Sequence, residues 1–296
     1  MVGTMPTDSG YHQALKTLPL IRPIEVKQRM RILMKSIHFI AVNYKSYAAA
    51  ERFIRSVDAA AAACKDFNAV VSVIDNGAAI TWQPPVAEHI KCELIAFEEN
   101  LGYLGAAQQV WNTTSTDYDF TAICNVDLEL APDFLQQLYA LEAIDNCGWL
   151  APDIYTTATQ RHENPFMNRR PKKINFIIWK AIYSSTLLYR IYSAISALKR
   201  RGAHNSNVCD IYAGHGSFML FTNEFAKQNP EIHFPGFMYC EELFLAELIR
   251  TCSMRTIYNP HLRIVNIGKV STALISQTKK SKWSLASLKE IEKQWF

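Results

Sequence analysis

Short apolar runs that alternate with helical patterns constrain the fold of this chain more than any other feature. The apolar runs are 37–42, 69–74, 92–97 and 120–124. The helical patterns between and after them are 47–64, 103–114 and 132–143. This alternation predicts an α/β fold with a doubly wound sheet that binds its ligand at the carboxyl ends of the strands. The length of 296 residues allows one large domain or two modest ones.

Polar side chains follow these apolar runs. They are Asn43, Asp75, Asn76, Asn100, Asn125 and Asp127. For any one loop an ordinary turn is an alternative explanation, because Asn and Asp favour turns. Their recurrence after consecutive strands of one predicted sheet indicates a shared binding crevice instead.

Six motifs follow one another between residues 37 and 272. They are 42–44 (VNY), 73–77 (VIDNG), 99–107 (ENLGYLGAA), 124–130 (CNVDLEL), 214–220 (GHGSFML) and 237–242 (FMYCEE). In this order and spacing the chain resembles the family 2 inverting glycosyltransferases of the GT-A fold, and within them the rhamnosyltransferase-like branch. The resemblance implies a doubly wound, Rossmann-like mixed sheet and a nucleotide-diphosphate sugar as donor, either dTDP-rhamnose or a UDP-sugar.

The resemblance also implies a set of donor-binding residues. They are Asn43, Asp75, Asn76, Asn100, Gly102, Gly105, Asn125 and Asp127. A carboxylate such as Asp75 can accept the N3–H of a uracil or thymine ring. Glycines such as Gly102 and Gly105 allow close backbone approach to an anion at a helix start, although a plain helix-entry turn also explains them.

Asn125-Val126-Asp127 stands where the family has Asp-x-Asp. The resemblance implies that Asp127 binds Mg²⁺ or Mn²⁺, which would neutralise the charge of the diphosphate leaving group. Asn266 stands at the end of a late strand where the family usually has a histidine metal ligand, so the sequence leaves the metal dependence open. Glu129 is expected either near the metal or in solvent.

Glu241 and Glu242 match the acidic pair of the family, whose second member acts as general base. A sugar hydroxyl is a poor nucleophile, so its proton must be removed during attack. We expect Glu242 to be this base with Glu241 supporting it; a solvated helix face is the alternative. His215 and Gly216 are expected to bind the acceptor, although a lone histidine is often structural.

A basic segment interrupts the resemblance. Nine of the 31 basic residues fall in 169–201, which has no acid, so the remaining chain carries 22 bases against 27 acids. They are Arg169, Arg170, Lys172, Lys173, Lys180, Arg190, Lys199, Arg200 and Arg201. We interpret the segment as an inserted basic amphipathic helix on an anionic membrane surface. A homodimer interface or packing on the body stays open, whereas nucleic acid is disfavoured because no RNA-binding motif accompanies the segment.

The sequence further predicts how the chain is organised. An N-terminal extension is expected at 1–35, a nucleotide-sugar half at 36–150, an acceptor half at 151–272 that contains the insertion, and a helical tail at 273–296. No secretory signal and no apolar stretch long enough to span a bilayer is recognised. Seven cysteines without paired spacing suggest free thiols, and we expect a cytoplasmic protein, peripheral on the cytosolic face of the inner (plasma) membrane.

The function expected from the resemblance is transfer of a sugar to a hydroxyl of a lipid-linked or cell-surface glycan. A polyprenyl-linked acceptor would place the reaction in polysaccharide biosynthesis, such as that of O-antigen or capsule. The alternative is a non-catalytic nucleotide- or glycan-binding module that uses the basic segment as a protein interface. A dinucleotide oxidoreductase is disfavoured, because no Gly-x-Gly-x-x-Gly follows the first strand.

Overall fold

A computed structural model describes residues 34–77, 82–141, 145–199, 205–268 and 276–296, with the side chains of 196–199 left out. The chain divides into two units, Met1–Met34 and Lys35–Phe296, and only the second is described below. Most of the expected N-terminal extension therefore lies outside the described residues.

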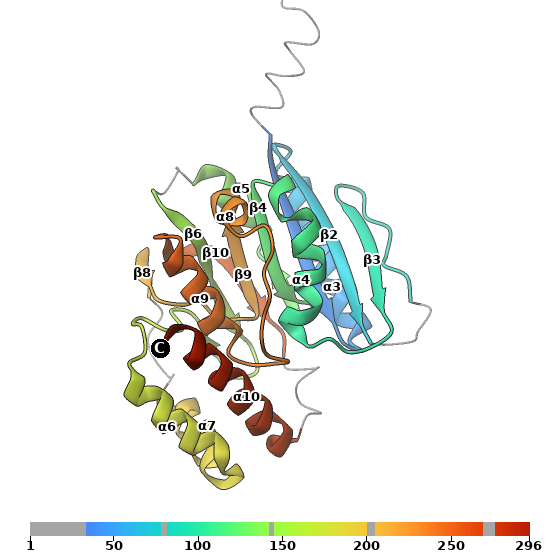
Figure 1. The fold of residues 1–296 in the computed structure, drawn as a ribbon. Helices are drawn as coiled ribbons and strands as arrows, with labels where there is room; N and C mark the ends of the chain where they lie inside the picture. Colours follow the sequence, from blue (N-terminus) through green and yellow to red (C-terminus); the bar gives the residue numbers. More distant parts are fainter. Residues whose placement is uncertain (1–33, 78–81, 142–144, 200–204, 269–275) are drawn as a thin grey trace, which may run out of the picture. The chain divides into compact units, whose positions relative to one another are not determined.

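One mixed sheet forms the centre of Lys35–Phe296 (Figure 1). Its main path runs in the order β3-β2-β1-β4-β9-β6-β10-β5, while β7 pairs with β6 and β8 with β10. The strands are β1 (Lys35–Asn43), β2 (Phe67–Asn76), β3 (Lys91–Phe97), β4 (Phe120–Asn125), β5 (Leu128–Leu130), β6 (Cys147–Thr156), β7 (Arg161–His162), β8 (Cys209–Ile211), β9 (Phe218–Thr222) and β10 (Arg255–Asn266). The predicted α/β fold with a doubly wound mixed sheet is confirmed.

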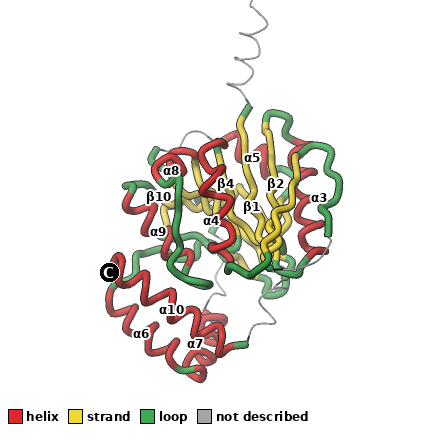
Figure 2. Tube along the Cα trace, turned by 45° about the vertical axis from the view of Figure 1, so that its right-hand side comes forward, coloured by secondary structure: helices red, strands yellow, loops and turns green. Residues whose placement is uncertain are grey.

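Helices cover both faces of this sheet (Figure 2). The helices are α3 (Tyr47–Ala63), α4 (Tyr103–Thr114), α5 (Phe134–Ala140), α6 (Lys173–Ser184), α7 (Thr186–Lys199), α8 (Asn223–Gln228), α9 (Glu241–Thr251) and α10 (Gln277–Trp295), with a 3-10 turn at Ser115–Asp117. In β1, Phe39 joins the core under α3 and α5, whereas its neighbour Ile40 joins the core under α4, α8 and α9. Because both faces are covered, β1 is buried from Ile37 to Asn43 and has an unbroken apolar run over residues 39–42 instead of alternating with polar residues.

The direction of the strands decides which loops meet. β2, β1 and β4 are parallel, so Asn43, Asn76 and Asn125 reach the same edge of the sheet. β9 is antiparallel to both β4 and β6, so its beginning, not its end, reaches that edge. β10 is parallel to β6 and therefore ends there at Asn266. This edge gathers residues from across the sequence.

The basic insertion is helical, as expected, but it is not one helix. Residue Ser185, in an extended conformation, ends α6 and separates it from α7. Both helices lie beside α10 and away from the sheet (Figures 1 and 2). None of the helices in the described part of the chain is long and apolar enough to cross a membrane. All seven cysteines are free thiols.

Candidate functional site

A cavity of about 630 Å³ lies at the edge where the strand ends meet. Its walls come from the ends of β1, β4 and β10, the first residues of α4 and α9, the 215–217 loop and the beginning of α10. Ten residues expected in the site line it. They are Asn76, Asn100, Gly102, Asn125, Asp127, His215, Gly216, Glu241, Glu242 and Asn266. The structure therefore brings together predicted site residues that lie up to 190 positions apart in the sequence, from Asn76 to Asn266.

Glu241 and Glu242 begin α9 behind two strained residues. Tyr239 and Cys240 have φ angles of 71° and 69°, in a left-handed region that costs roughly 1–2 kcal/mol for a residue with a side chain. The strained turn lets the Tyr239 N–H donate to Glu241 Oε1 at 2.8 Å. Burial, together with the charge of Glu242, raises the pKa of Glu241 to about 8. Glu241 therefore carries a proton for most of the time at neutral pH.

Glu242 is half-buried and faces the 215–217 loop. Its Oε1 accepts the Gly216 N–H at 3.1 Å, while the Gly216 carbonyl accepts the Tyr103 hydroxyl at 2.9 Å. A Cβ atom on Gly216 would lie 2.5 Å from Glu242 Oε1, so only glycine allows this approach. The main-chain N–H of Gly216 thus holds one oxygen of the Glu242 carboxylate, and Glu242 lines the cavity.

His215 is oriented by its neighbours in the same loop. Its ring Nδ1 accepts the Ser217 main-chain N–H at 3.2 Å and lies 2.9 Å from Ser217 Oγ, while the main-chain N–H of His215 donates to Asn164 Oδ1 at 2.8 Å. With Nδ1 as acceptor, a neutral ring carries its proton on Nε2. The imidazole therefore lines the cavity as a potential hydrogen-bond donor.

Asn76 and Asn100 hold the loop that precedes α4. Asn76 Nδ2 donates to Asn100 Oδ1 at 3.1 Å and to the Gly102 carbonyl at 2.9 Å, and Asn76 Oδ1 accepts the Leu101 N–H at 2.8 Å. Gly102 has φ 78°, and a Cβ there would collide with the Phe237 carbonyl. These two asparagines line the cavity, but their side-chain bonds shape the entry of α4.

Asn125, Asp127 and Asn266 supply the oxygens that a cation could use. The Asp127 carbonyl accepts the Ile267 N–H at 3.1 Å, which ties the two strand ends together. Asn266 Oδ1 already accepts the Gly268 N–H at 3.0 Å. No group of three or more His, Cys, Asp or Glu side chains suited to a metal occurs in the described residues. One carboxylate with amide oxygens fits a hard divalent ion that takes its remaining ligands from phosphate oxygens and water.

Glu129, expected near the metal or in solvent, does not line the cavity formed by the described residues. Its Oε1 lies 3.6 Å from Arg52 Nε in a partly exposed ion pair. Asn43 also has a local role, because its Oδ1 accepts the Ser46 N–H at 2.9 Å at the start of α3. Gly105 lies inside the first turn of α4 and not in the loop before it.

Asp75 is buried at the end of β2 and does not line the cavity formed by the described residues. Both of its carboxylate oxygens accept the Tyr47 hydroxyl, at 3.2 and 3.1 Å. Burial raises the pKa of Asp75, and the hydrogen bond from Tyr47 opposes this shift. The Tyr47 ring in turn packs on Trp82, with 5.4 Å between the ring centroids.

Several residues of the cavity wall are missing from the sequence predictions. They are Tyr44, Lys45, Tyr103, Tyr239, Lys279 and Trp283. Lys45 lies two residues after the end of β1, so its closeness to a strand end could have indicated a place in the cavity wall. Lys279 and Trp283 belong to α10, which packs on the 237–239 segment through a 4.9 Å contact between the Trp283 and Phe237 rings. Nothing local in the sequence indicates that contact.

No protein-family model and no curated protein sequence matches this chain. Among solved structures it is similar to GalNAc-T7 with UDP, GalNAc and Mn²⁺, with a TM-score of 0.49 and 14% identity over 84% of this chain and 47% of that one. It is also similar to the mannosyltransferase PcManGT from Pyrobaculum calidifontis with GDP-Man and Mn²⁺, with a TM-score of 0.48 and 14% identity over 84% of this chain and 66% of the other. This chain thus spans about half of the first protein and just under two thirds of the second.

Proposed function

We propose that the protein is an inverting glycosyltransferase of the GT-A type that moves a sugar from a nucleotide diphosphate to an acceptor hydroxyl. The observation that carries this proposal is the shared cavity of Glu241-Glu242 and Asn125-Val126-Asp127. The Glu241-Glu242 pair can accept a proton from the acceptor hydroxyl, and the Asn125-Val126-Asp127 motif can hold the charged leaving group. A sugar bound between them would be attacked on one face while its diphosphate departs from the other.

Glu242 is the proposed general base. A protonated Glu241 cannot take a proton, whereas Glu242 reaches the cavity with one oxygen held by the Gly216 N–H. Glu241, which is buried beside Glu242, is the proposed supporting residue. His215 and Gly216 would bind the acceptor. The acceptor class we propose is a lipid-linked or cell-surface glycan.

The diphosphate is proposed to bind among Lys45, Lys279 and the N-terminal turn of α4. Two ammonium groups and the free N–H groups of a helix start favour an anion in the same cavity. Asp127, with Asn125 and Asn266 nearby, would hold Mg²⁺ or Mn²⁺. Such an ion neutralises charge on the leaving diphosphate when bound. The proposed donor is dTDP-rhamnose or a UDP-sugar. Asp75 is kept as the proposed reader of the uracil or thymine N3–H, which requires the base to extend past the cavity wall formed by the described residues and to share the Asp75 carboxylate with the Tyr47 hydroxyl.

The first test measures thermal stability with dTDP, UDP or GDP, each with and without Mn²⁺. A nucleotide that binds the native state at 100 times its Kd stabilises it by about 2.7 kcal/mol. We expect dTDP or UDP to raise the Tm with Mn²⁺ present, and the Asp127→Asn variant to lose most of this shift. If no nucleotide raises the Tm, the proposed donor site is wrong.

The second test separates an enzyme from a binding module. Glu242→Gln keeps an oxygen for the Gly216 N–H but cannot take a proton, so we expect turnover to fall by about 10²- to 10⁴-fold. The nucleotide-induced Tm shift should persist. Unchanged turnover in Glu242→Gln together with loss in Glu241→Gln would move the base to Glu241, and a product that retains the donor's anomeric configuration would exclude inversion.

A further inference from the structure

The helical pair α6–α7, called the hairpin below, concentrates exposed apolar side chains. Seven of the ten large hydrophobic residues exposed in the described part of the chain belong to it. They are Ile174, Ile177, Ile178, Leu187, Leu188, Ile191 and Ile195. Exposed aliphatic residues are normally scattered singly over a protein surface. Their concentration on two adjacent helices indicates a surface that is covered in use.

The exposed aliphatic residues are not the ones that hold the hairpin in place. Phe176 is fully buried, and its ring packs 4.3 Å from the ring of Phe296. Lys180, one turn further on, donates to both carboxylate oxygens of Glu292 at 2.9 and 2.7 Å. Ile174, Ile177 and Ile178 have helical spacing on the side of α6 that these anchors leave free. The hairpin thus has one face for α10 and another for a partner.

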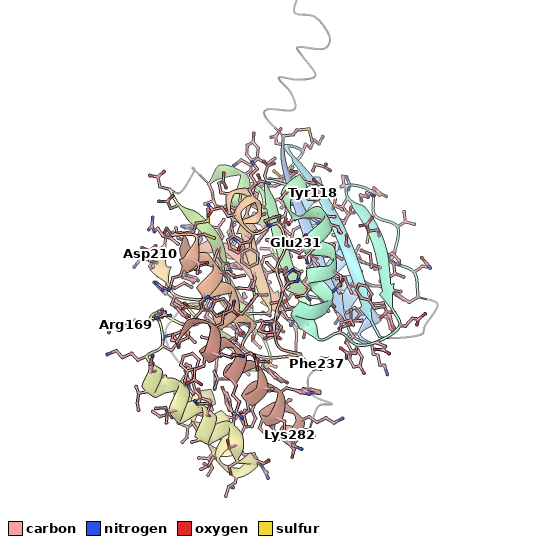
Figure 3. All side chains as sticks on the ribbon, viewed as in Figure 1. Tyr118, Arg169, Asp210, Glu231, Phe237 and Lys282 are labelled. Carbon is pink, nitrogen blue, oxygen red and sulfur yellow. The ribbon has the colours of Figure 1, made fainter. Side chains whose placement is uncertain are left out.

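The charge of the hairpin identifies the partner. Two bases of the segment are matched by acids outside it, Arg170 by Glu247 and Lys180 by Glu292. The further bases Arg169, Lys172, Lys173 and Arg190 are exposed. Arg169 extends outward ahead of α6 in Figure 3. The free surface therefore combines aliphatic side chains with positive charge, in a segment that contains no acid.

We propose that the hairpin docks on an anionic phospholipid bilayer. Helices that lie in a membrane interface bury an apolar face among the acyl chains while basic residues contact anionic headgroups. Trp179 and Tyr183 pack against the core of the body, so the apolar contact with the bilayer falls to the exposed aliphatic residues. A second copy of the chain fits less well, because a twofold interface through this face would bring together two copies of a basic segment that contains no acid.

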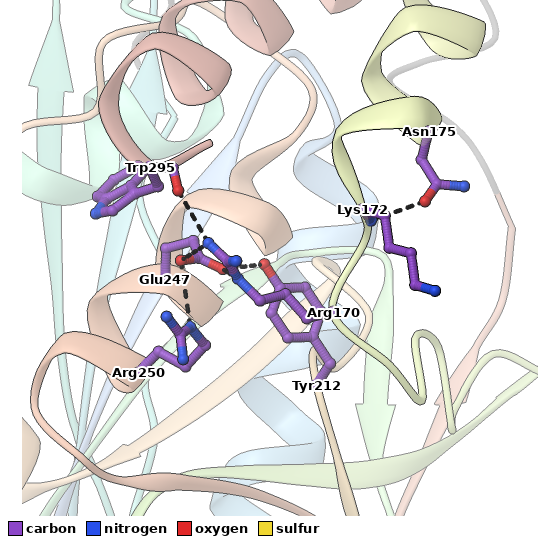
Figure 4. Close-up of polar contacts among 7 residues, drawn as sticks. All are labelled: Arg170, Lys172, Asn175, Tyr212, Glu247, Arg250 and Trp295. Atoms are coloured by element: carbon purple, nitrogen blue, oxygen red, sulfur yellow. Dashed lines mark hydrogen bonds and ion pairs between the residues drawn. The ribbon is translucent and has the colours of Figure 1, made fainter.

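The base of the hairpin is fixed to the body, so docking would orient the whole unit Lys35–Phe296. The Arg170 guanidinium donates to both oxygens of Glu247 on α9, at 2.8 and 2.9 Å, and to the Trp295 carbonyl at 2.9 Å (Figure 4). The Tyr212 hydroxyl donates to the same carboxylate at 2.7 Å. The helix that carries Glu241 and Glu242 and the helix that supports the hairpin are joined at this point. The docking proposal itself does not depend on the proposed sugar chemistry.

The test is co-sedimentation of the full chain with vesicles of phosphatidylglycerol and phosphatidylcholine, compared with phosphatidylcholine alone. We expect binding to the anionic vesicles, at least about tenfold weaker binding for Lys172→Glu/Lys173→Glu, and unchanged binding for the matched control Lys65→Glu/Lys227→Glu. The control lysines are exposed and lie outside the segment. The variant Ile177→Ser/Leu187→Ser/Ile191→Ser should also lose binding, with its Tm close to that of the parent because these side chains are exposed.

Equal binding of the parent to neutral vesicles would overturn the anionic specificity and with it the proposal. Failure to bind anionic vesicles would overturn it as well. A dimer in light scattering that the triple serine variant converts to a monomer, without vesicle binding by the parent, would assign the hairpin to a subunit interface.

Discussion

Gly216 lies against the Glu242 carboxylate, which a side chain at position 216 would have to displace. A Cβ at this position would lie 2.5 Å from Glu242 Oε1 and 3.0 Å from its carboxyl carbon, so Gly216→Ala must displace the carboxylate. Because a displacement of about 1 Å can cost 10²-fold in rate, we expect turnover to fall by about that factor. Steady-state kinetics checks the loss, and the nucleotide-induced Tm shift should remain.

Gly105→Ala is the control for adding a methyl group beside this cavity. A Cβ at this position would contact only Leu101 Cβ, at 3.9 Å, and Gly105 lies within the helix α4. Since alanine is a better helix former than glycine, we expect this variant to raise the free energy of unfolding by about 0.5–1 kcal/mol. Loss of turnover in Gly216→Ala accompanied by a large loss of stability would mean that the loop, not the carboxylate, was disturbed.

Glu241 makes stability depend on pH at the same site. Burial and Glu242 raise its pKa in the folded state from 4.5 to about 8, so the folded state binds the proton more tightly than the unfolded state. Its contribution to stability is therefore fully present below about pH 4.5 and is lost as pH rises towards 8. We expect Glu241→Gln, which cannot ionise, to become progressively more stable relative to the parent over this range. Urea unfolding at pH 5, 6.5 and 8 measures the free energy of unfolding of both proteins. A difference between the variant and the parent that does not vary with pH would contradict the prediction.

At the scale of elements, one ion-pair cluster joins α9, α10 and the segment before α6. Burial alone would raise the pKa of Glu247, but hydrogen bonds from Arg170 and Tyr212 and the charges of Arg170 and Arg250 bring it below its ordinary value. Arg170→Ala would leave this buried carboxylate with weaker partners. We expect a loss on the order of 2 kcal/mol, less than the roughly 3–5 kcal/mol of a fully buried pair, because Arg170 is partly exposed and two partners remain.

Arg250→Ala is the matched comparison on the same carboxylate. Arg250 is more exposed and its Nε lies 3.3 Å from Glu247 Oε2, so we expect its loss to cost less than about 1 kcal/mol. Urea unfolding of both variants checks the order. Equal costs would show that Arg170 acts only as a surface charge.

The elements up to residue 143 follow closely from the sequence apart from β5, whereas after it the sequence predicts the helical insertion and the helical tail but not the strands β6 to β9 or their directions. The predicted strand 37–42 and helix 103–114 match β1 and α4, because apolar runs and turn residues mark their ends locally. β9, by contrast, is buried at every position and runs against its neighbours. Its four apolar residues and Thr222 carry no sign of strand direction, and the direction of β9 is what brings His215 and Gly216 to the cavity.

At the scale of the whole unit Lys35–Phe296, the predicted crevice is found where parallel strands end. The strand-end residues Asn76, Asn125 and Asp127 and the acidic pair could be placed there from motif order, whereas Asn43 and Asp75 do not line the cavity. The wall formed by Lys279 and Trp283 could not, since it depends on α10 packing against a segment about 45 residues earlier. The break of the insertion at Ser185 also escaped prediction, because the apolar pattern continues through it.

The cavity and the hairpin are separate surfaces of this unit, which predicts a double dissociation. No residue that lines the cavity is among the exposed aliphatic residues or exposed bases of the hairpin. Changes at independent sites have nearly additive effects. We therefore expect Asp127→Asn to remove the Tm shift produced by UDP or dTDP with Mn²⁺ while its binding to phosphatidylglycerol vesicles equals that of the parent. Lys172→Glu/Lys173→Glu should weaken binding to the phosphatidylglycerol vesicles and keep the nucleotide-induced Tm shift of the parent. If Asp127→Asn also weakened vesicle binding, the two surfaces would be coupled, and α10, which touches both, would be the element to examine by hydrogen exchange.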